Sequence, residues 1–149
     1  MDITLSKALD LAGKLDDSPG DNTSRERFRR FLKTDIAEAE ILTGTRDLRR
    51  AAKMLFDWGS QEIVLTHRDG VLVFDGRGYH EAGFYPRELV GRSGRGDTCI
   101  AAYSCKRLDS PPAEAVIWAA AITSLKMETD GPFSASEEEV EDLIERRYR

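Results

Sequence analysis

The chain has 149 residues, a length typical of one globular domain that can bury most of its apolar surface on folding. Its formal net charge is -5 and no broad basic face is implied, which disfavours nucleic-acid binding. No run approaches the roughly 18 to 20 apolar residues that cross a bilayer, and the start Met1-Asp2 is unlike a signal peptide. We therefore expect a single cytoplasmic domain over residues 1–149, without nucleic-acid or membrane partners.

The first third of the chain predicts a strand, a loop and a helix. Lys7–Ala12 has the composition of a short strand, and the Ser, Pro, Gly and Asn residues of segment 16–24 indicate a loop. Ser24 is placed to cap a short helix that runs through Leu32.

Two further helices are predicted from capping patterns. Asp35 opens a capping box, Asp-Ile-Ala-Glu, for a helix that ends at Gly44. Thr45 is placed to cap a helix that runs to Trp58 and ends at Gly59.

The middle of the chain predicts strands. Segment 62–66 is a continuous apolar run, which suits a strand buried on both faces near the centre of a parallel sheet. The turn dipeptides at 69–70 and 75–76 bracket a strand at 71–74, and a further strand follows at 79–84, so this stretch predicts a β-meander at a sheet edge.

The last third predicts helices over about 97–108, 110–127 and 136–147. Pro residues start the second of these, its Ala-rich face permits close packing, and Ser136 with Glu139 caps the third. Strands followed by helices indicate an α/β layered fold with a helical C-terminal third.

The cysteines and tryptophans are predicted to serve packing. Cys99 and Cys105 lie six residues apart without a Cys or His cluster, so we expect reduced thiols in or near the core. Trp58 and Trp118 lie on predicted helices and are expected to anchor the core.

The glycine-rich segment 91–98, Gly-Arg-Ser-Gly-Arg-Gly-Asp-Thr, carries the chemistry. Glycines allow backbone N–H groups to converge, and the first turn of the following helix offers further unpaired N–H donors to a phosphate. Asp97 beside them is a candidate base for a hydroxyl. The segment has no lysine for a Walker A loop, and its glycine spacing differs from that of the dinucleotide fingerprint.

These residues resemble the ribokinase-like (PfkB) carbohydrate and nucleoside kinases. Segment 93–98 is similar to the family's Thr-Gly-Ala-Gly-Asp signature, with Arg95 in place of alanine. Other blocks follow the family's order: Lys33–Gly44 resembles its Lys-Pro-Asn-x-x-Glu block, Ile63–Thr66 with Asp69-Gly70 its Val-Thr-x-Gly turn, and Ala113–Lys126 its Ala-rich helix. The resemblance implies a three-layer, Rossmann-like α/β sheet with helices on both faces.

The resemblance also implies site residues for an ATP- and Mg2+-dependent kinase acting on a sugar, polyol or nucleoside. Asp97 would be the catalytic base, and the backbone of Gly94, Arg95 and Gly96 would form the anion hole for the γ-phosphate. Arg95 is also a candidate phosphate clamp, although a solvated loop cation is an open alternative.

Nucleotide and metal ligands are implied in the same way. Thr66 would lie near the nucleotide phosphates and the segment around Gly131 near the adenine. Glu38 would help hold Mg2+ through water. Asp35 could join it, or serve only as the cap of its helix.

Only the family's C-terminal, nucleotide-side half is matched. The family's acceptor-contacting residues and β-strand lid belong to its other half, so we expect a fold truncated at the N-terminus and without a lid. Two functions stay open: a kinase, or a catalytically incompetent nucleotide-binding or interaction module that needs a complementing partner chain or a second copy.

Overall fold

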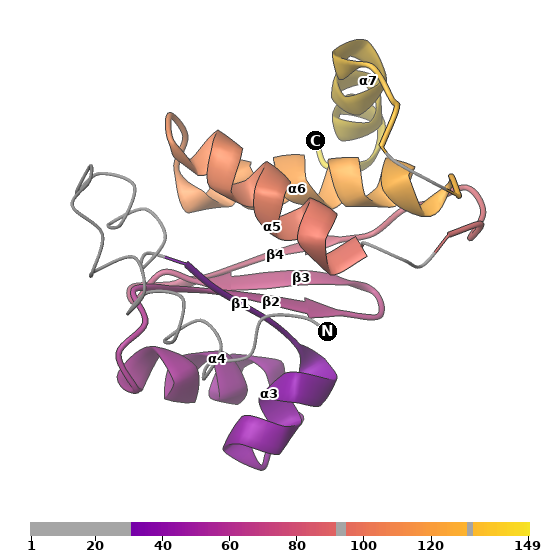
Figure 1. The fold of residues 1–149 in the computed structure, drawn as a ribbon. Coiled ribbons are helices and arrows are strands. Elements are labelled where there is room, and N and C mark those ends of the chain that lie inside the picture. The colour runs from indigo at the N-terminus through magenta and orange to yellow at the C-terminus, as the bar shows by residue number, and fades with distance from the viewer. Residues whose placement is uncertain (1–30, 92–94, 131–132) are drawn as a thin grey trace, which may run out of the picture. The chain divides into compact units, whose positions relative to one another are not determined.

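The computed structural model describes residues 31–91, 95–130 and 133–149 (Figure 1). Its sheet has the order β1-β2-β3-β4. The strands are β1 (Phe31–Asp35), β2 (Glu62–His67), β3 (Gly70–Phe74) and β4 (Tyr79–Gly83). The helices are α3 (Ile36–Thr43), α4 (Leu48–Asp57), α5 (Arg95–Arg107), α6 (Pro112–Met127) and α7 (Glu137–Arg147). The strand predicted at 7–12 and the loop predicted at 16–24 lie outside the described residues.

The described chain divides into two compact units. Among the described residues, the first unit comprises 31–67 together with Leu72–Tyr79, and the second comprises Arg68–Val71, 80–91, 95–130 and 133–149. The α/β class is as predicted, and the described sheet has four strands. One domain over 1–149, and helices on both faces of the sheet, stay predictions.

The prediction of a helix that runs through Leu32 is wrong at its end, because Leu32 lies in strand β1. Leu32 instead lies opposite Ile63 in a parallel ladder between β1 and β2, and it is 2% exposed. The polar Lys33 in the middle of the segment hides its strand character in the sequence. Lys33 is nevertheless buried, so the whole centre of β1 belongs to the interior.

Both helices of the first unit begin after an aspartate that caps them. Asp35 accepts a hydrogen bond from the N–H of Glu38 at 2.8 Å, and Gly44 ends α3 with φ of +78°, as predicted. The prediction that Thr45 caps α4 is wrong. Asp47 caps this helix by accepting from Arg50 N at 3.1 Å, while the Thr45 hydroxyl accepts from Asp47 N in the preceding turn.

The core of the first unit lies where α3 and α4 pack on β1 and β2. Its buried apolar residues are Leu32, Ala39, Ala51, Ala52, Leu55, Ile63, Leu65, Leu72 and Phe74. Strand β2 is buried along nearly its whole length and lies inside the sheet, and β2, β3 and β4 form the predicted meander.

The second unit contains α5, α6 and α7. Helix α6 buries the predicted small-residue face, Ala115, Ala119, Ala120 and Ala121. Ser136 caps α7 as predicted, accepting from Glu139 N at 3.2 Å. Helix α5 begins at Arg95 rather than at Asp97, so its first turn includes Gly96.

Two packing predictions are wrong. Cys99 is buried as expected, but Cys105 is exposed on α5. Trp58 forms the C-cap of α4 and is 50% exposed, because the turn at Gly59 follows directly and carries the chain away from the helix. Trp118 packs at the edge of the apolar cluster between α6 and α7. Among the described residues, no helix combines the length and the apolar character needed to cross a bilayer.

Candidate functional site

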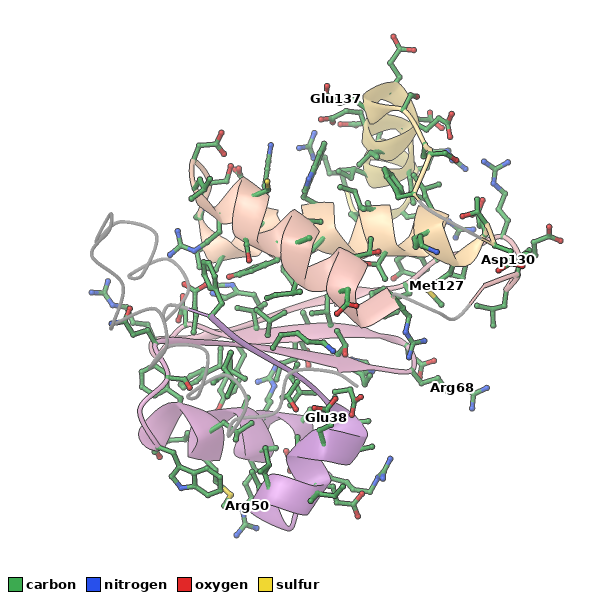
Figure 2. The ribbon with its side chains drawn as sticks, in the orientation of Figure 1. Glu38, Arg50, Arg68, Met127, Asp130 and Glu137 are labelled. Atoms are coloured by element: carbon green, nitrogen blue, oxygen red, sulfur yellow. The ribbon has the colours of Figure 1, made fainter. Side chains whose placement is uncertain are left out.

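The second unit contains a pocket of about 580 Å³. Two arginines and one aspartate line it together with an apolar wall. The lining residues are Arg68, Asp69, Phe84, Pro86, Leu89, Arg95 and Met127. Figure 2 shows Arg68 at the turn that follows β2 and Met127 at the end of α6.

The turn that carries Arg68 is held by backbone contacts. Phe84 N donates to Asp69 O at 2.8 Å, which ties the β2–β3 turn to the end of β4. A side chain at Gly70 would overlap the carbonyl oxygen of Ala82 and lie 3.0 Å from Cα of Gly83. Glycine is therefore needed at position 70 for this close approach, and the turn is fixed beside the pocket.

The entry to the glycine-rich loop is fixed against the end of α6. Val90 N and Gly91 N both donate to Met127 O, at 2.9 and 3.2 Å. A Cβ at Gly91 would overlap the carbonyl oxygen of Thr129. The first glycine of the predicted anion loop thus has a packing role, since it lets two backbone segments touch.

Helix α5 supplies the predicted catalytic groups. Arg95 is its first residue and lines the pocket, with its guanidinium carbon 6.0 Å from the centroid of the Phe84 ring. Asp97 lies exposed in the first turn. The N–H groups of a first helical turn have no acceptor within the helix, so those of Arg95 and Gly96 are suited to an anion. Gly94, the remaining predicted anion-hole residue, lies outside the described residues.

In the first unit, the predicted metal and phosphate ligands gather at the carboxyl ends of two parallel strands. Asp35 lies opposite Thr66 in the β1–β2 ladder, and Glu38 follows in the first turn of α3. This edge is where open α/β sheets bind ligands. Thr66 is 3% exposed. Its contact with the nucleotide phosphates stays a prediction.

The geometry of Asp35 can be compared with its two predicted roles, as a helix cap and as a ligand of Mg2+ through water. Its Oδ1 accepts the N–H of Glu38 at 2.8 Å, which is the capping role. Mg2+ takes one or two carboxylates, retains several waters and completes its shell with substrate phosphates. The carboxylates of Asp35 and Glu38, which are three positions apart in the chain, are of the type that such a water-mediated site uses, and the Oε2 atom of Glu38 is buried. Within the described ranges, no three His, Cys, Asp or Glu residues converge as direct metal ligands.

Several pocket residues were not found by sequence reasoning. Arg68, Phe84, Leu89 and Met127 lie on segments that no motif connects, and only the fold brings them together. The sequence offered a signal only for Arg68, because this residue directly precedes Asp69-Gly70, the turn dipeptide that resembles the family's turn. Gly131, predicted near the adenine, lies outside the described residues.

No family model matches the chain. A cytidine kinase of Thermococcus kodakarensis is 40% identical over 63 residues, which are 40% of this chain and 23% of that protein. A pyrophosphate-dependent kinase in the ribokinase family, solved with a pyrophosphate analog and myo-inositol, is 40% identical. The match has a TM-score of 0.69 and covers 80% of this chain and 43% of that one.

This chain is a homologue of ribokinase-family kinases. An Escherichia coli protein assigned as a ribokinase II, in complex with ATP and Mg2+, shares the fold at a TM-score of 0.69 and 21% identity, over 95% of this chain and 46% of that one. The ribokinase-family homologue therefore spans less than half the length of each of these relatives, and its fold is a partial ribokinase-like fold.

Proposed function

We propose that this ribokinase-family homologue is an ATP-dependent phosphotransferase that transfers the γ-phosphate to a hydroxyl of a sugar, polyol or nucleoside. The observation that carries the proposal is the head of α5. There the carboxylate of Asp97 is exposed in the same helical turn as the backbone donors of Arg95 and Gly96, beside a pocket that Arg95 lines. The 40% identical ribokinase-family kinase, which was solved with a pyrophosphate analog and myo-inositol, supports it.

In the proposed reaction, Asp97 accepts the proton of the acceptor hydroxyl. The acceptor oxygen forms a bond to the γ-phosphorus, and the bond from that phosphorus to the β-phosphate oxygen breaks. The N–H groups of Gly94, Arg95 and Gly96 stabilise the charge on the transferred group. Gly131 would approach the adenine and Thr66 the phosphates.

Asp35 and Glu38 would hold Mg2+ through water. When bound, Mg2+ neutralises phosphate charge and orients the donor. The contribution of this chain's own residues is to supply two carboxylates just after β1, one from Asp35 at the end of the strand and one from Glu38 in the first turn of α3.

The test is phosphoryl transfer from ATP to a panel of sugars, polyols and nucleosides, followed by product detection. Wild type is compared with Asp97→Asn and with Asp109→Asn, a matched control just beyond the opposite end of α5. General-base help is worth about a hundredfold or more, so Asp97→Asn should lose at least that while Asp109→Asn stays near wild type. Retention of more than about a tenth of the rate by Asp97→Asn would show that another group is the base.

A second candidate function is a nucleotide-binding or interaction module that acts with a partner chain. The observation in its favour is the coverage, because more than half of each compared relative has no counterpart in these 149 residues. Orientation of an acceptor can be worth about 7 to 11 kcal/mol of barrier, so a site without acceptor contacts would turn over poorly. Solution mass and turnover by the purified chain separate the two, since a monomer that phosphorylates an acceptor unaided rules the module out.

A further inference from the structure

We infer that Ser124 and Tyr148 are positioning residues for the ligand of the pocket in the second unit. Both hold the segment 83–87, which begins at the end of β4 and which we call the pocket wall. Phe84 and Pro86 of this wall line the pocket, and the two positioning residues do not, so they act on the ligand only through the wall. The inference deepens the proposed function and rests on it for the identity of the ligand as the phosphoryl donor.

The pocket wall after β4 belongs to no strand or helix, so its backbone N–H groups find their acceptors on other segments. Position 86 is a proline and has no N–H to pair. The three remaining bonds are Phe84 N to Asp69 O at 2.8 Å, Tyr85 N to Ser124 Oγ at 2.9 Å and Arg87 N to Glu128 Oε2 at 3.0 Å. Two of these acceptors are side chains of α6 and its C-cap, so the end of α6 determines the path of the wall.

The hydroxyl of Ser124 is buried and forms two strong bonds. It donates to Ala120 O at 2.7 Å, one turn earlier in α6, and it accepts from Tyr85 N. Loss of this hydroxyl would leave the N–H of Tyr85 without its acceptor on α6. Because an unpaired N–H away from water is costly, the wall would shift until that group reached another acceptor.

Tyr148, the C-cap of α7, holds the wall at a second point. Its hydroxyl donates to Gly83 O at 2.5 Å, and its ring packs edge-on against the ring of Tyr85, with centroids 5.2 Å apart. Burial raises the pKa of Tyr148 to about 12, so the hydroxyl keeps its proton and stays a donor at neutral pH. A Cβ at Gly83 would lie 3.0 Å from the Tyr85 hydroxyl oxygen, which shows how closely this ring folds back over the wall.

The two anchors act on the residues that flank Phe84. Tyr148 bonds the residue before it and Ser124 the residue after it, and the two hydroxyl oxygens are themselves 3.5 Å apart. With both neighbours fixed, the direction in which the Phe84 side chain leaves the backbone is fixed as well. The Phe84 ring lines the pocket and lies 6.0 Å from the guanidinium carbon of Arg95, so the anchors set the shape of the pocket beside the head of α5.

This arrangement predicts an effect on binding rather than on the chemical step. The proposed base, Asp97, lies on α5 and not on the wall. A displaced wall would therefore weaken contact with the donor while the base kept its place. A purely structural role would instead lower the amount of folded protein, and with it the apparent kcat, without changing KM.

The experiment measures the Kd of ATP by calorimetry, and kcat and KM for ATP in phosphoryl transfer, on the full chain well below its Tm. The variants are Ser124→Ala and Tyr148→Phe. Thr123→Val is the matched control for the first, because Thr123 is also buried on α6 and, among the described residues, its hydroxyl bonds only Ala119 O. Tyr79→Phe is the control for the second, since it removes a tyrosine hydroxyl that donates to a backbone carbonyl in the first unit.

We expect Ser124→Ala and Tyr148→Phe each to raise the Kd and the KM for ATP about fivefold or more, with kcat within about twofold of wild type. Both controls should change all three quantities less than about twofold, because neither removes a bond to the wall. The Tm of each variant without ligand shows whether the chain is folded at the assay temperature.

ATP affinity that stays unchanged in Ser124→Ala and Tyr148→Phe overturns the inference, and so does a wild type that does not bind ATP. Failure of the inference is distinguishable from failure of the proposed function. Wild-type turnover with an unchanged KM in both variants removes the positioning role and leaves the kinase assignment standing. ATP binding that weakens in both variants, without turnover by wild type, supports the positioning role and contradicts the kinase assignment.

Discussion

Replacement of Gly70 by alanine is expected to disturb both the stability of the second unit and its pocket. A Cβ at this position would overlap the carbonyl oxygen of Ala82 and press on the backbone of Gly83. Because both neighbours are main-chain groups in a strand, they cannot rotate away as a flexible side chain would. Overpacking of this kind costs about 1 to 3 kcal/mol of unfolding free energy.

Gly78 provides the matched control for the same change. It lies on the next turn along the chain, its φ is not left-handed, and a Cβ there would have no neighbour within 4 Å. Alanine at an unstrained glycine stabilises by about 0.4 to 1 kcal/mol, because it reduces the conformational entropy of the unfolded chain. The two variants should therefore change stability in opposite directions.

The assay is thermal unfolding of wild type, Gly70→Ala and Gly78→Ala, followed by donor binding. A loss of about 1 to 3 kcal/mol lowers the Tm by about 2 to 12 °C in a domain of this size. Gly70→Ala should also weaken pyrophosphate or ATP binding, because the displaced turn carries Arg68. If Gly70→Ala is as stable as Gly78→Ala, the close approach of the turn to β4 does not constrain this region and the reasoning is wrong.

Three further predictions concern the cap of α3, Tyr148 near the C-terminus and the salt dependence of donor binding. Asp35→Ala should lower the unfolding free energy by about 0.5 to 2 kcal/mol, because it removes the cap to Glu38 N. Asp35→Asn keeps an oxygen that can cap the helix and should retain most of the stability. Urea unfolding measures both variants, and an equal loss in the two would point to a role beyond capping. Burial raises the pKa of Tyr148 from 10.0 to about 12, so the folded state holds its proton more tightly than the unfolded state and stability should fall as pH rises from about 10 to 12. Tyr148→Phe should flatten that decline, and it also removes the hydrogen bond from the Tyr148 hydroxyl to Gly83 O at 2.5 Å. An unchanged dependence of stability on pH in this variant would contradict the assignment of the decline to Tyr148. Donor binding should weaken as salt rises from low ionic strength, because the pocket arginines act by charge; a salt-independent dissociation constant would argue for apolar recognition instead.

Local patterns predicted the elements whose signals are local. The Asp35 cap, the glycine at 44 and the Ser136 cap each involve residues within one helical turn or at a helix end, and all three are observed. The continuous apolar run of β2 likewise predicted its buried, interior position.

The missed features depend on contacts that are distant in sequence. Strand β1 was missed because Lys33 breaks its apolar pattern, and its pairing with β2 joins residues 31 positions apart, as in Leu32 and Ile63. The pocket was missed for the same reason. Met127 O accepts from Val90 N, and Phe84 N donates to Asp69 O, so its frame consists of backbone bonds between separate elements. A motif search could find Asp97 but not the surface beside it.

The central claim is that Asp97 acts as the base of a phosphoryl transfer. Its most direct test measures kcat for transfer and the dissociation constant of the donor in wild type and Asp97→Asn at one pH. The account predicts that Asp97→Asn binds the donor as well as wild type does and loses about a hundredfold or more in kcat. Wild-type transfer that Asp97→Asn preserves to within tenfold would contradict it.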